Sequence, residues 1–260
     1  MKKLFTSSLL AFGLVASANA ADSDKTIAIG ATPVPHVEIL EIARPLLKAE
    51  GFELEIKEFN DYTIPNLATQ DGDLDANFFQ HLPYLKEFNK TKGTTLVETT
   101  GVHLEPMGVY SAKIKDLKEL KDGDSVAVPN DPTNESRALD VLANAGLIKL
   151  NDNPLKTPLD ITENPKNLKF SETETAQLPR VLDDVSIAVI NTNYAMNANL
   201  NPLKDALAIE SNDSPYVNYV VVKQGNENSP KIKALDKALT SKEVKDFIIE
   251  KYQGGILPAF

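Results

Sequence analysis

A polar turn with an arginine just behind it is the strongest candidate for ligand chemistry in this sequence. Val128 ends a short apolar run, polar residues fill 129–134, and Arg137 follows in what reads as the start of a helix. Free backbone N–H groups at a helix start favour an anion, and a guanidinium can hold a carboxylate by two parallel hydrogen bonds. We therefore expect Arg137 to bind a carboxylate. The alternative is a surface arginine paired with Glu135 or Asp140.

A second candidate is a set of aromatic side chains in two nearby segments. Tyr62 follows an expected strand at 59–61, and Phe78, Phe79, His81 and Tyr84 cluster after residues 75–77. Such walls suit an apolar side chain that carries a sulfur atom, because sulfur–aromatic contacts are favourable. Adjacent residues of a strand point in opposite directions, so at most one of the two phenylalanines should face a cleft. The alternative for each ring is ordinary core packing.

Two asparagine-containing segments complete the polar candidates. Asn191 to Tyr194 directly follow an apolar strand, and Asn218 stands where the segment 214–219 opens another strand. An amide can accept a hydrogen bond from an ammonium and donate one to a carboxylate. Asn193 and Asn218 are therefore possible ligand contacts, although asparagines that merely form turns are the alternative.

No motif for catalysis or for a metal is present. His36, His81 and His103 are the only histidines, and they have no spacing typical of metal ligands. The common signatures of metalloproteases, serine hydrolases and nucleotide-binding loops are missing as well. We therefore expect a protein without catalytic residues, without a bound metal and without a cofactor.

The elements that must position these residues alternate between strand and helix. The first strand, a helix at 39–47 and the strand at 54–56 make a β-α-β start, which favours a parallel sheet with a right-handed crossover. The fold class is therefore α/β. Further strands are expected at 75–79, 95–98, 107–111, 125–128, 186–190 and 217–222.

The chain is long enough for two lobes. We expect one lobe to contain residues 22–109 together with 223–260, and the other to be an insertion formed by residues 110–222. The hinges then lie near Val109-Tyr110 and near Val221-Val222. Ligands of open α/β sheets bind beyond the carboxyl ends of the strands, so the binding site is expected in the cleft between the lobes.

The first twenty residues have the layout of a secretory signal. Lys2 and Lys3 precede a short apolar run, and Ala18-Asn19-Ala20 is a typical cleavage site. The run is too short to span a bilayer as a helix. We therefore take residues 1–20 as a cleaved signal peptide and expect the mature protein in the periplasm.

The composition limits the partners and the anchoring. The 27 basic residues, less the two lysines of the signal, leave 25 against 37 acidic ones, a formal charge of −12. Such a surface repels nucleic acid, so no nucleic-acid partner is expected. The sequence has no cysteine, which argues against disulfides and zinc thiolates and leads us to expect a protein that is not lipid-anchored. A monomer is expected.

Several exact runs of residues resemble a known family, the methionine-binding, NlpA-type substrate-binding proteins of bacterial ABC transporters. They occur in family order across nearly the whole mature chain. With x for a position outside the match, the runs are FNDY at 59–62, DLDANxFQHxPYL at 73–85, VAVPNDPTN at 126–134 with Arg137, ENPKNL at 163–168, QLPR at 177–180, VINTxYA at 189–195 and DSPYVN at 213–218.

The resemblance implies a fold, a ligand and a role for each candidate residue. The fold would be a two-lobe periplasmic binding protein, type II-like, that closes on L-methionine or a close amino acid and delivers it to the transporter permease. Arg137 would grip the ligand carboxylate, and Asn193 and Asn218 would hold the α-amino and carboxylate groups. The side-chain pocket would be lined by Tyr62, Phe79, His81 and Tyr84.

Two features of the sequence leave alternatives open. Family members often carry a cysteine at the cleavage site, where this chain has Ala20-Ala21. Some family members also bind another amino acid or a short peptide, so the ligand is less defined than the binding role. Functions of other classes are an exported hydrolase, which would use Ser136 or a pair of acids, and a surface adhesin.

Overall fold

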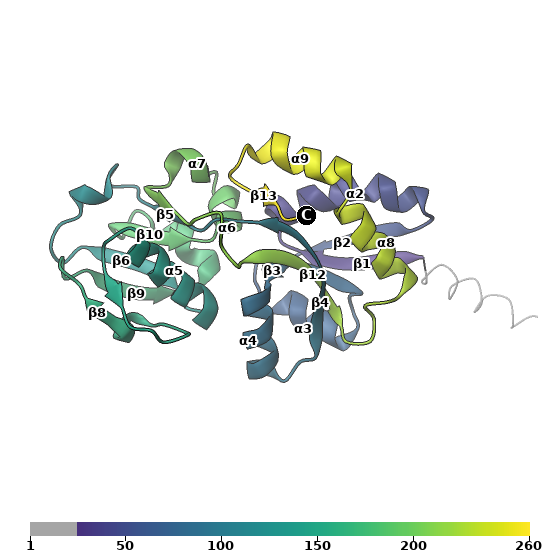
Figure 1. Ribbon diagram of the computed structural model, residues 1–260, viewed down its shortest axis with the longest axis horizontal. Helices are drawn as coiled ribbons and strands as arrows, with labels where there is room; N and C mark the ends of the chain where they lie inside the picture. The colour runs from purple at the N-terminus through teal and green to yellow at the C-terminus, as the bar shows by residue number, and fades with distance from the viewer. Residues whose placement is uncertain (1–24) are drawn as a thin grey trace, which may run out of the picture.

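The computed structural model describes residues 25–260, which form two α/β lobes side by side (Figure 1). The expected signal peptide, residues 1–20, lies outside the described residues. Within the described part of the chain, no helix is long and apolar enough to cross a membrane. The α/β fold class and the division into two lobes agree with the prediction from the sequence.

The first lobe is built on a six-stranded mixed sheet. Its strand order is β13-β4-β12-β3-β1-β2, with β1 parallel to β2 and β3, and with β12 antiparallel to both β3 and β4. The central strands read as apolar runs because helices cover both faces. The bounds are β1 Thr26–Ala31, β2 Glu53–Glu58, β3 Ala76–His81, β4 Leu96–Leu104, β12 Val217–Lys223 and β13 Leu257–Pro258.

Helices cover both faces of this sheet. On one face, α2, α8 and α9 bury apolar side chains such as Leu40, Leu235 and Ile248 against Ile27 and Phe78. On the other face, α3 and α4 pack against the central strands, as Figure 1 shows. A short π-helical turn, η1, leads into α2. The bounds are η1 Pro33–Val37, α2 Glu38–Ala49, α3 Ile64–Asp71, α4 Leu82–Lys92, α8 Pro230–Leu239 and α9 Lys242–Tyr252.

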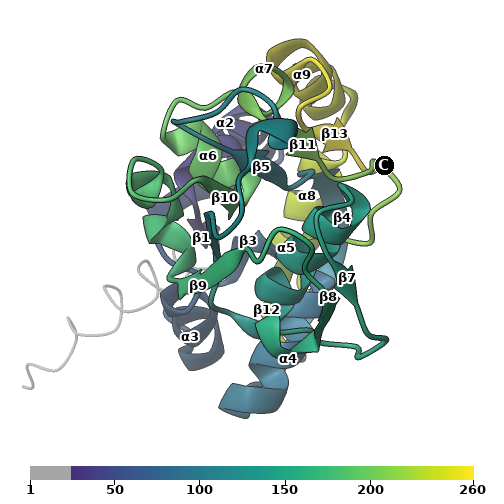
Figure 2. The same ribbon diagram turned by 90° about the vertical axis from the view of Figure 1, so that its left-hand side faces the viewer.

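The second lobe has a five-stranded sheet in the order β11-β5-β10-β6-β9. Helix α5 buries Leu139 and Leu142 on one face, and α6 with the 3-10 segment η4 covers the other, as Figure 2 shows end-on for α5 and α6. Strand β6 is parallel to both β9 and β10. The bounds are β5 Gly108–Tyr110, β6 Ser125–Pro129, β9 Lys169–Thr173, β10 Ile187–Ile190, β11 Ala208–Ile209, α5 Pro132–Asn144, η4 Thr175–Val181, α6 Thr192–Asn197 and α7 Pro202–Asp205.

Short strands and 3-10 turns lie at the outer end of the second lobe. A two-stranded antiparallel sheet of β7 and β8 lies beyond α5, with a 3-10 turn before β8 and another before β6. Residues 151–160 form the loop between β7 and β8. The bounds are β7 Lys149–Leu150, β8 Ile161–Glu163, η2 Leu117–Glu119 and η3 Pro158–Asp160.

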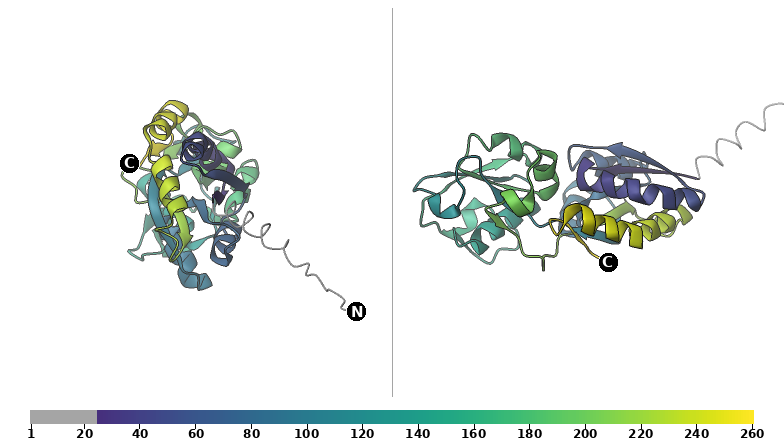
Figure 3. Two further views of the ribbon diagram at one scale, coloured as in Figure 1. Left: turned by 90° about the vertical axis from the view of Figure 1, so that its right-hand side faces the viewer. Right: turned by 90° about the horizontal axis from the view of Figure 1, so that it is seen from above.

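Two short connections join the lobes, and Figure 3 shows how narrow the junction is when the molecule is seen from above. The first runs from the end of β4 at Leu104 to β5 at Gly108, and the second runs from the end of β11 at Ile209 to Val217. Both crossings lie earlier in the chain than the hinges expected from the sequence. The second differs most, because β12 belongs entirely to the first lobe, where it pairs with β3 and β4. An apolar run predicts a strand but does not tell which of two sheets will take it.

Candidate functional site

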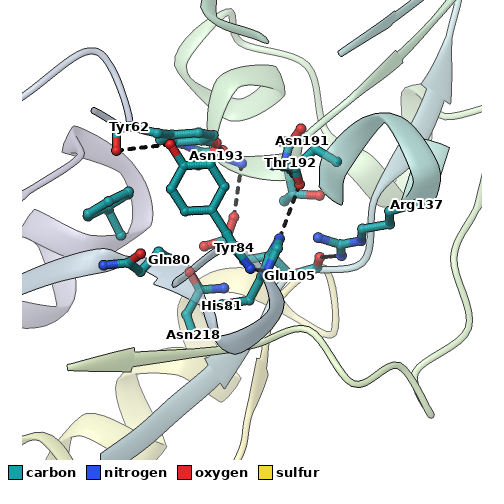
Figure 4. Close-up of a pocket in the computed structure, with 12 residues that line it drawn as sticks. Tyr62, Gln80, His81, Tyr84, Glu105, Arg137, Asn191, Thr192, Asn193 and Asn218 are labelled. Carbon is teal, nitrogen blue, oxygen red and sulfur yellow. Dashed lines mark hydrogen bonds between the residues drawn. The ribbon is translucent and has the colours of Figure 1, made fainter. Parts of the chain in front are cut away.

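A cavity with about 330 Å³ of empty space lies between the two lobes (Figure 4). It opens where β3 of the first lobe and the parallel strands β6 and β10 of the second lobe reach their carboxyl ends, as expected for an α/β fold. All seven residues singled out from the sequence line it. The lining residues are Tyr62, Phe79, Gln80, His81, Tyr84, Glu105, Asn134, Arg137, Asn191, Thr192, Asn193 and Asn218.

Three aromatic rings of the first lobe form one wall of the cavity. Tyr62 stacks on Phe79 with 5.6 Å between ring centroids, and Tyr84 meets Tyr62 edge-on at 5.7 Å. The Tyr84 hydroxyl donates to the backbone oxygen of Tyr62 at 3.1 Å, which fixes the pair. Phe78 instead points into the core of its lobe, so only one of the two adjacent phenylalanines faces the cavity, as expected.

His81 joins this wall as a neutral ring of defined tautomer. It ends β3 and caps α4, where its Nδ1 accepts from the backbone N–H of Tyr84 at 3.2 Å. The proton therefore lies on Nε2, which donates across the cleft to Oδ1 of Asn134 at 3.1 Å. Burial lowers the pKa of His81 to about 3, with a further lowering from Arg137. The ring is thus uncharged at neutral pH.

A chain of amides on the second lobe has its orientation set by one carboxylate. Asp131 caps α5 and accepts from Nδ2 of Asn134 at 2.9 and 3.0 Å. Oδ1 of Asn134 must then face the other way, where it accepts from Nδ2 of Asn191 at 2.9 Å as well as from His81. This leaves Oδ1 of Asn191 as a buried acceptor with no partner among the described residues.

Arg137 supplies the positive charge of the cavity. Its Nε and Nη2 pair with the Glu210 carboxylate at 3.0 and 2.5 Å, and Nη2 also donates to the backbone oxygen of Glu105 at 2.6 Å. The Tyr216 ring lies 4.2 Å from the guanidinium carbon and stacks on it. Nη1 has no hydrogen-bond partner among the described residues, so one edge of the guanidinium is left for a ligand.

Two details of Arg137 differ from the expectation. The residue lies in the second turn of α5 rather than in the first, and its ion-pair partner is Glu210 instead of Glu135 or Asp140. Glu210 is 73 positions away, beside the second crossing, and neither periodicity nor spacing could have revealed it. Arg137 therefore makes its two parallel hydrogen bonds to the carboxylate of Glu210, whereas we expected them to go to a ligand carboxylate.

The two predicted asparagines reach the cavity from opposite lobes. Asn193 accepts from the Tyr62 hydroxyl at 2.7 Å, and burial raises the pKa of Tyr62 well above its usual value, so the hydroxyl keeps its proton. Nδ2 of Asn193 is a buried donor without a partner in the described part of the chain. Asn218 opens β12, and its Oδ1 lies 3.2 Å from Nε2 of His36.

Sequence reasoning missed five of the lining residues. Asn134 and Asn191 stood inside motifs that it had already singled out, and Gln80 and Thr192 were direct neighbours of named residues. Glu105 had a weaker signal, an isolated acid within the apolar run 102–107. The missed lining residues are Gln80, Glu105, Asn134, Asn191 and Thr192.

Two histidines that share no spacing in the sequence meet Glu105 directly behind the cavity. Nε2 of His103 lies 2.7 Å from Oε1 of Glu105, and Nε2 of His36 lies 3.3 Å from the same oxygen. The three ligand-type atoms fall within 4.8 Å of one another, which is close enough to hold a metal ion. The hydrogen bond between His103 and Glu105, with His36 in contact with the same oxygen, accounts for this closeness.

Comparison with known proteins agrees with this geometry. The model of the family described as NlpA lipoprotein matches residues 27–260. The chain belongs to the NlpA lipoprotein family. It is 43% identical to the methionine-binding lipoprotein MetQ of Bacillus subtilis over 99% of both chains. It is also 44% identical to the D-methionine-binding lipoprotein MetQ of Escherichia coli K12, over 88% of this chain and 86% of that protein.

Solved structures of relatives have the same two-lobe fold. A nutrient-binding protein from Burkholderia cenocepacia, bound to methionine, is 47% identical and superposes with a TM-score of 0.87 over 90% of this chain and 100% of that one. A lipoprotein from Ruminococcus gnavus, also 47% identical, gives a TM-score of 0.89 over 91% of this chain and 100% of that one. The chain thus has the periplasmic binding protein fold of this family.

The family corrects one expectation. We expected a protein free in the periplasm and not lipid-anchored, since the sequence has no cysteine. The family is one of lipoproteins, and the relatives from Bacillus subtilis and Escherichia coli are both named as lipoproteins. The expectation of an unanchored protein is therefore wrong. That expectation rested only on the absence of cysteine, whereas the family match covers residues 27–260.

Proposed function

We propose that this member of the NlpA lipoprotein family is a substrate-binding protein that captures methionine and delivers it to the permease of an ABC transporter. The observation that carries the proposal is that one cavity contains both an unpaired hydrogen-bond donor and an unpaired hydrogen-bond acceptor. Nδ2 of Asn193 is a buried donor without a partner, and Oδ1 of Asn191 is a buried acceptor without one, within the described residues. Leaving such groups unpaired costs about 1–3 kcal/mol each, which a bound zwitterion would recover.

The donors suit the carboxylate of an amino acid. The free edge of Arg137 and the amide nitrogen of Asn193 both line the cavity, and both can only donate in the arrangement described. A carboxylate there would meet a charged donor and a neutral one. Because Glu210 already neutralises much of the guanidinium charge, the second donor is a necessary part of this proposal.

The aromatic wall suits the methionine side chain. Tyr62, Phe79 and Tyr84 offer ring faces and edges, and a thioether gains about 0.3–1.5 kcal/mol from such contacts. Two relatives named for D-methionine or methionine support the same ligand class.

The mechanism proposed is closure of the lobes around the ligand. The aromatic wall belongs to the first lobe and Arg137 to the second, so a ligand contacts both only when the lobes are together. Such a ligand stabilises the closed state, since that state alone supplies both sets of contacts. The permease would then recognise the closed form of a monomeric binding protein.

A hydrolase function has no support at this site. Ser136, the nucleophile considered from the sequence, is buried in α5 and is not among the residues that line the cavity. The relatives quoted above are named as binding proteins. We therefore infer binding without a chemical step.

A thermal-shift screen tests the ligand. The protein is unfolded and refolded to remove any bound molecule, and is then mixed with each enantiomer of methionine, the other common amino acids and a few dipeptides. Ligand at 100 times its dissociation constant adds about 2.7 kcal/mol to the stability. For a chain of this size, each kcal/mol of added stability raises Tm by roughly 2–4 °C. Stabilisation by a dipeptide, with no shift for either methionine, would refute the proposed ligand.

Removing the guanidinium tests the site. We expect Arg137→Ala to weaken methionine binding by about 2–5 kcal/mol, because the ligand carboxylate would be buried without its charged donor. Titration calorimetry measures the loss. Arg44→Ala is the matched control, since Arg44 also pairs with a glutamate but lies half-exposed on α2, away from the cavity. Unchanged affinity in Arg137→Ala would contradict the assignment.

A further inference from the structure

Glu105 is a lining residue to which neither the sequence motifs nor the proposed function assigns a role. It lies in the first crossing between the lobes, and its side chain is 8% exposed. Among the twelve lining residues it is the only acid, as Arg137 is the only arginine or lysine. In Figure 4, Glu105 lies among the labelled side chains of both lobes. The cavity wall thus carries one group of each sign.

The carboxylate of Glu105 has hydrogen bonds but no cation to pair with. Oε1 accepts from Nε2 of His103 at 2.7 Å and lies 3.3 Å from Nε2 of His36, and Oε2 accepts from the backbone N–H of Asn193 at 3.0 Å. Burial lowers the pKa of both histidines to about 3, so each is neutral. Arg137 meets only the backbone oxygen of Glu105, because its charge is paired with Glu210.

The hydrogen bonds also show where a further donor fits. The hydroxyl of Thr32 lies 2.8 Å from Nδ1 of His36, so Nε2 of that ring can donate towards Glu105. Oε1 of Glu105 therefore accepts from His103 and lies beside Nε2 of His36, which is also 3.2 Å from Oδ1 of Asn218. Each carboxylate oxygen offers about two acceptor positions, and Oε2 uses one of them for Asn193. One position on Oε2 is left, on a buried carboxylate that accepts no hydrogen bond from a lysine or arginine side chain among the described residues.

We propose that Glu105 is a ligand-contacting residue whose Oε2 accepts a hydrogen bond from the α-ammonium group of the bound amino acid. The inference rests on the proposed function and deepens it, since it assigns the cationic end of the zwitterion to a carboxylate. The wall then matches the ligand charge for charge: Arg137 faces the carboxylate and Glu105 faces the ammonium. Burial also raises the pKa of Glu105, although Arg137 and the backbone N–H of Asn193 lower it in part, and a bound ammonium would favour the charged form.

The experiment compares two ligands on two proteins. The ligands are methionine and 4-(methylthio)butanoate, which has the same side chain and carboxylate but no amino group. The proteins are the wild type and Glu105→Gln, which keeps the shape and removes the charge. We expect Glu105→Gln to lose about 30-fold or more in methionine affinity, as for a buried charge that loses its partner. The affinity for the analogue should change by less than about 3-fold, within the few tenths of a kcal/mol typical of neutral changes.

A matched control variant tests whether the effect is specific to Glu105, and a second measurement replaces the variant if it does not fold. Glu135→Gln also replaces a buried glutamate, but Glu135 does not line the cavity, and the preference for methionine should be unchanged. If Glu105→Gln fails to fold, the wild type is titrated from neutral to mildly acidic pH. Methionine affinity should then fall as Glu105 takes up a proton, while analogue affinity does not. The neighbouring histidines do not interfere, because their pKa values are about 3.

Three results would overturn the inference. An equal loss for both ligands in Glu105→Gln would make Glu105 a purely structural residue, and an unchanged preference for methionine would remove it from the ligand. Parallel pH profiles for the two ligands would also contradict an ammonium contact. A wild type that binds neither ligand would instead refute the proposed function, so the two failures are distinguishable.

Discussion

At the scale of single residues, the polarity of the cavity depends on Asp131, a side chain that does not line it. Asp131 orients Asn134, and Asn134 in turn orients Asn191 and His81. Each step follows from the fact that a carboxylate only accepts hydrogen bonds while an amide has one accepting and one donating end. The unpaired acceptor on Asn191 is therefore a consequence of a helix cap three positions before the lining residue Asn134.

A residue-scale prediction concerns Glu135. Burial raises its pKa to about 7, with a further contribution from Glu172, and its Oε1 has no partner in the described part of the chain. The folded protein therefore binds more protons than the unfolded chain between the ordinary value of 4.5 and about 7. The free energy of unfolding should fall as the pH rises through this interval. We expect Glu135→Gln to stabilise the protein by about 1–2 kcal/mol at mildly alkaline pH.

Denaturant unfolding at mildly acidic and mildly alkaline pH measures this effect. The control is Glu163→Gln, since Glu163 is exposed and pairs with Lys149 on the same lobe. The variant should differ from the wild type on the alkaline side alone. A gain of the same size at both pH values would show that the charge of Glu135 is not the cause.

The candidate site could be predicted in large part from the sequence, residue by residue. Phe79 ends an expected strand, and Tyr62 and Arg137 come shortly after expected strands or turns. Such positions at the carboxyl ends of strands converge in an α/β fold. Their partners could not be predicted in this way. The contacts of Arg137 with Glu210 and of Glu105 with His36 join residues far apart in the chain, and only the packing of elements brings them together.

At the scale of elements, helix α5 connects fold stability to the site. Its cap Asp131 accepts from the backbone N–H of Asn134, from the hydroxyls of Thr133 and Thr175, and from the side-chain amide of Asn134. Pro132 in the first turn fixes the start of the helix. The same carboxylate thus begins a helix and holds a lining residue in place.

We expect Asp131→Ala to have two effects. Loss of the cap should lower the free energy of unfolding by about 0.5–2 kcal/mol. Methionine affinity should fall as well, because Asn134 is then free to turn its amide. Ser229→Ala is the control, since Ser229 caps α8 through Ile232 without a link to the cavity. Denaturant unfolding and calorimetry of both variants separate the effects, and equal affinities would contradict the orienting role.

The order of strands and helices followed from the sequence more closely than the division between lobes did. Apolar runs gave β1, β6 and β10 nearly to the residue, because both faces of these strands are buried. Because β12 is also apolar, its sequence would suit the sheet of either lobe, and it could not be assigned to the first lobe from the sequence. Register with β3 and β4 decides the matter, and register depends on contacts made only in the folded chain.

At the scale of the whole molecule, direct hydrogen bonds join the lobes next to the cavity. The Tyr62 hydroxyl donates to Asn193, and the Tyr194 hydroxyl donates to the backbone oxygen of Asn60 at 3.3 Å. These bonds form only when the lobes are together, so they set the balance between open and closed forms along with the ligand.

We expect Tyr194→Phe to shift that balance towards the open form. Tyr194 does not line the cavity, so methionine affinity should fall by only the worth of one hydrogen bond, about 0.5–1.5 kcal/mol. Small-angle scattering without ligand should show a larger radius of gyration. Tyr252→Phe is the control, because its hydroxyl bonds to Glu38 within the first lobe. A scattering profile identical to that of the wild type would count against a role of this bond in closure.

The two ends of the second lobe leave it as neighbouring strands. Gly108 of β5 pairs with Ile209 of β11, and Val109 pairs with Ala208, so the points of entry and exit lie about 5 Å apart. A segment whose ends meet in this way can be exchanged as a cassette. Residues 107–210 of one family member could replace those of another, and the chimaera would combine the arginine of one protein with the aromatic rings of the other.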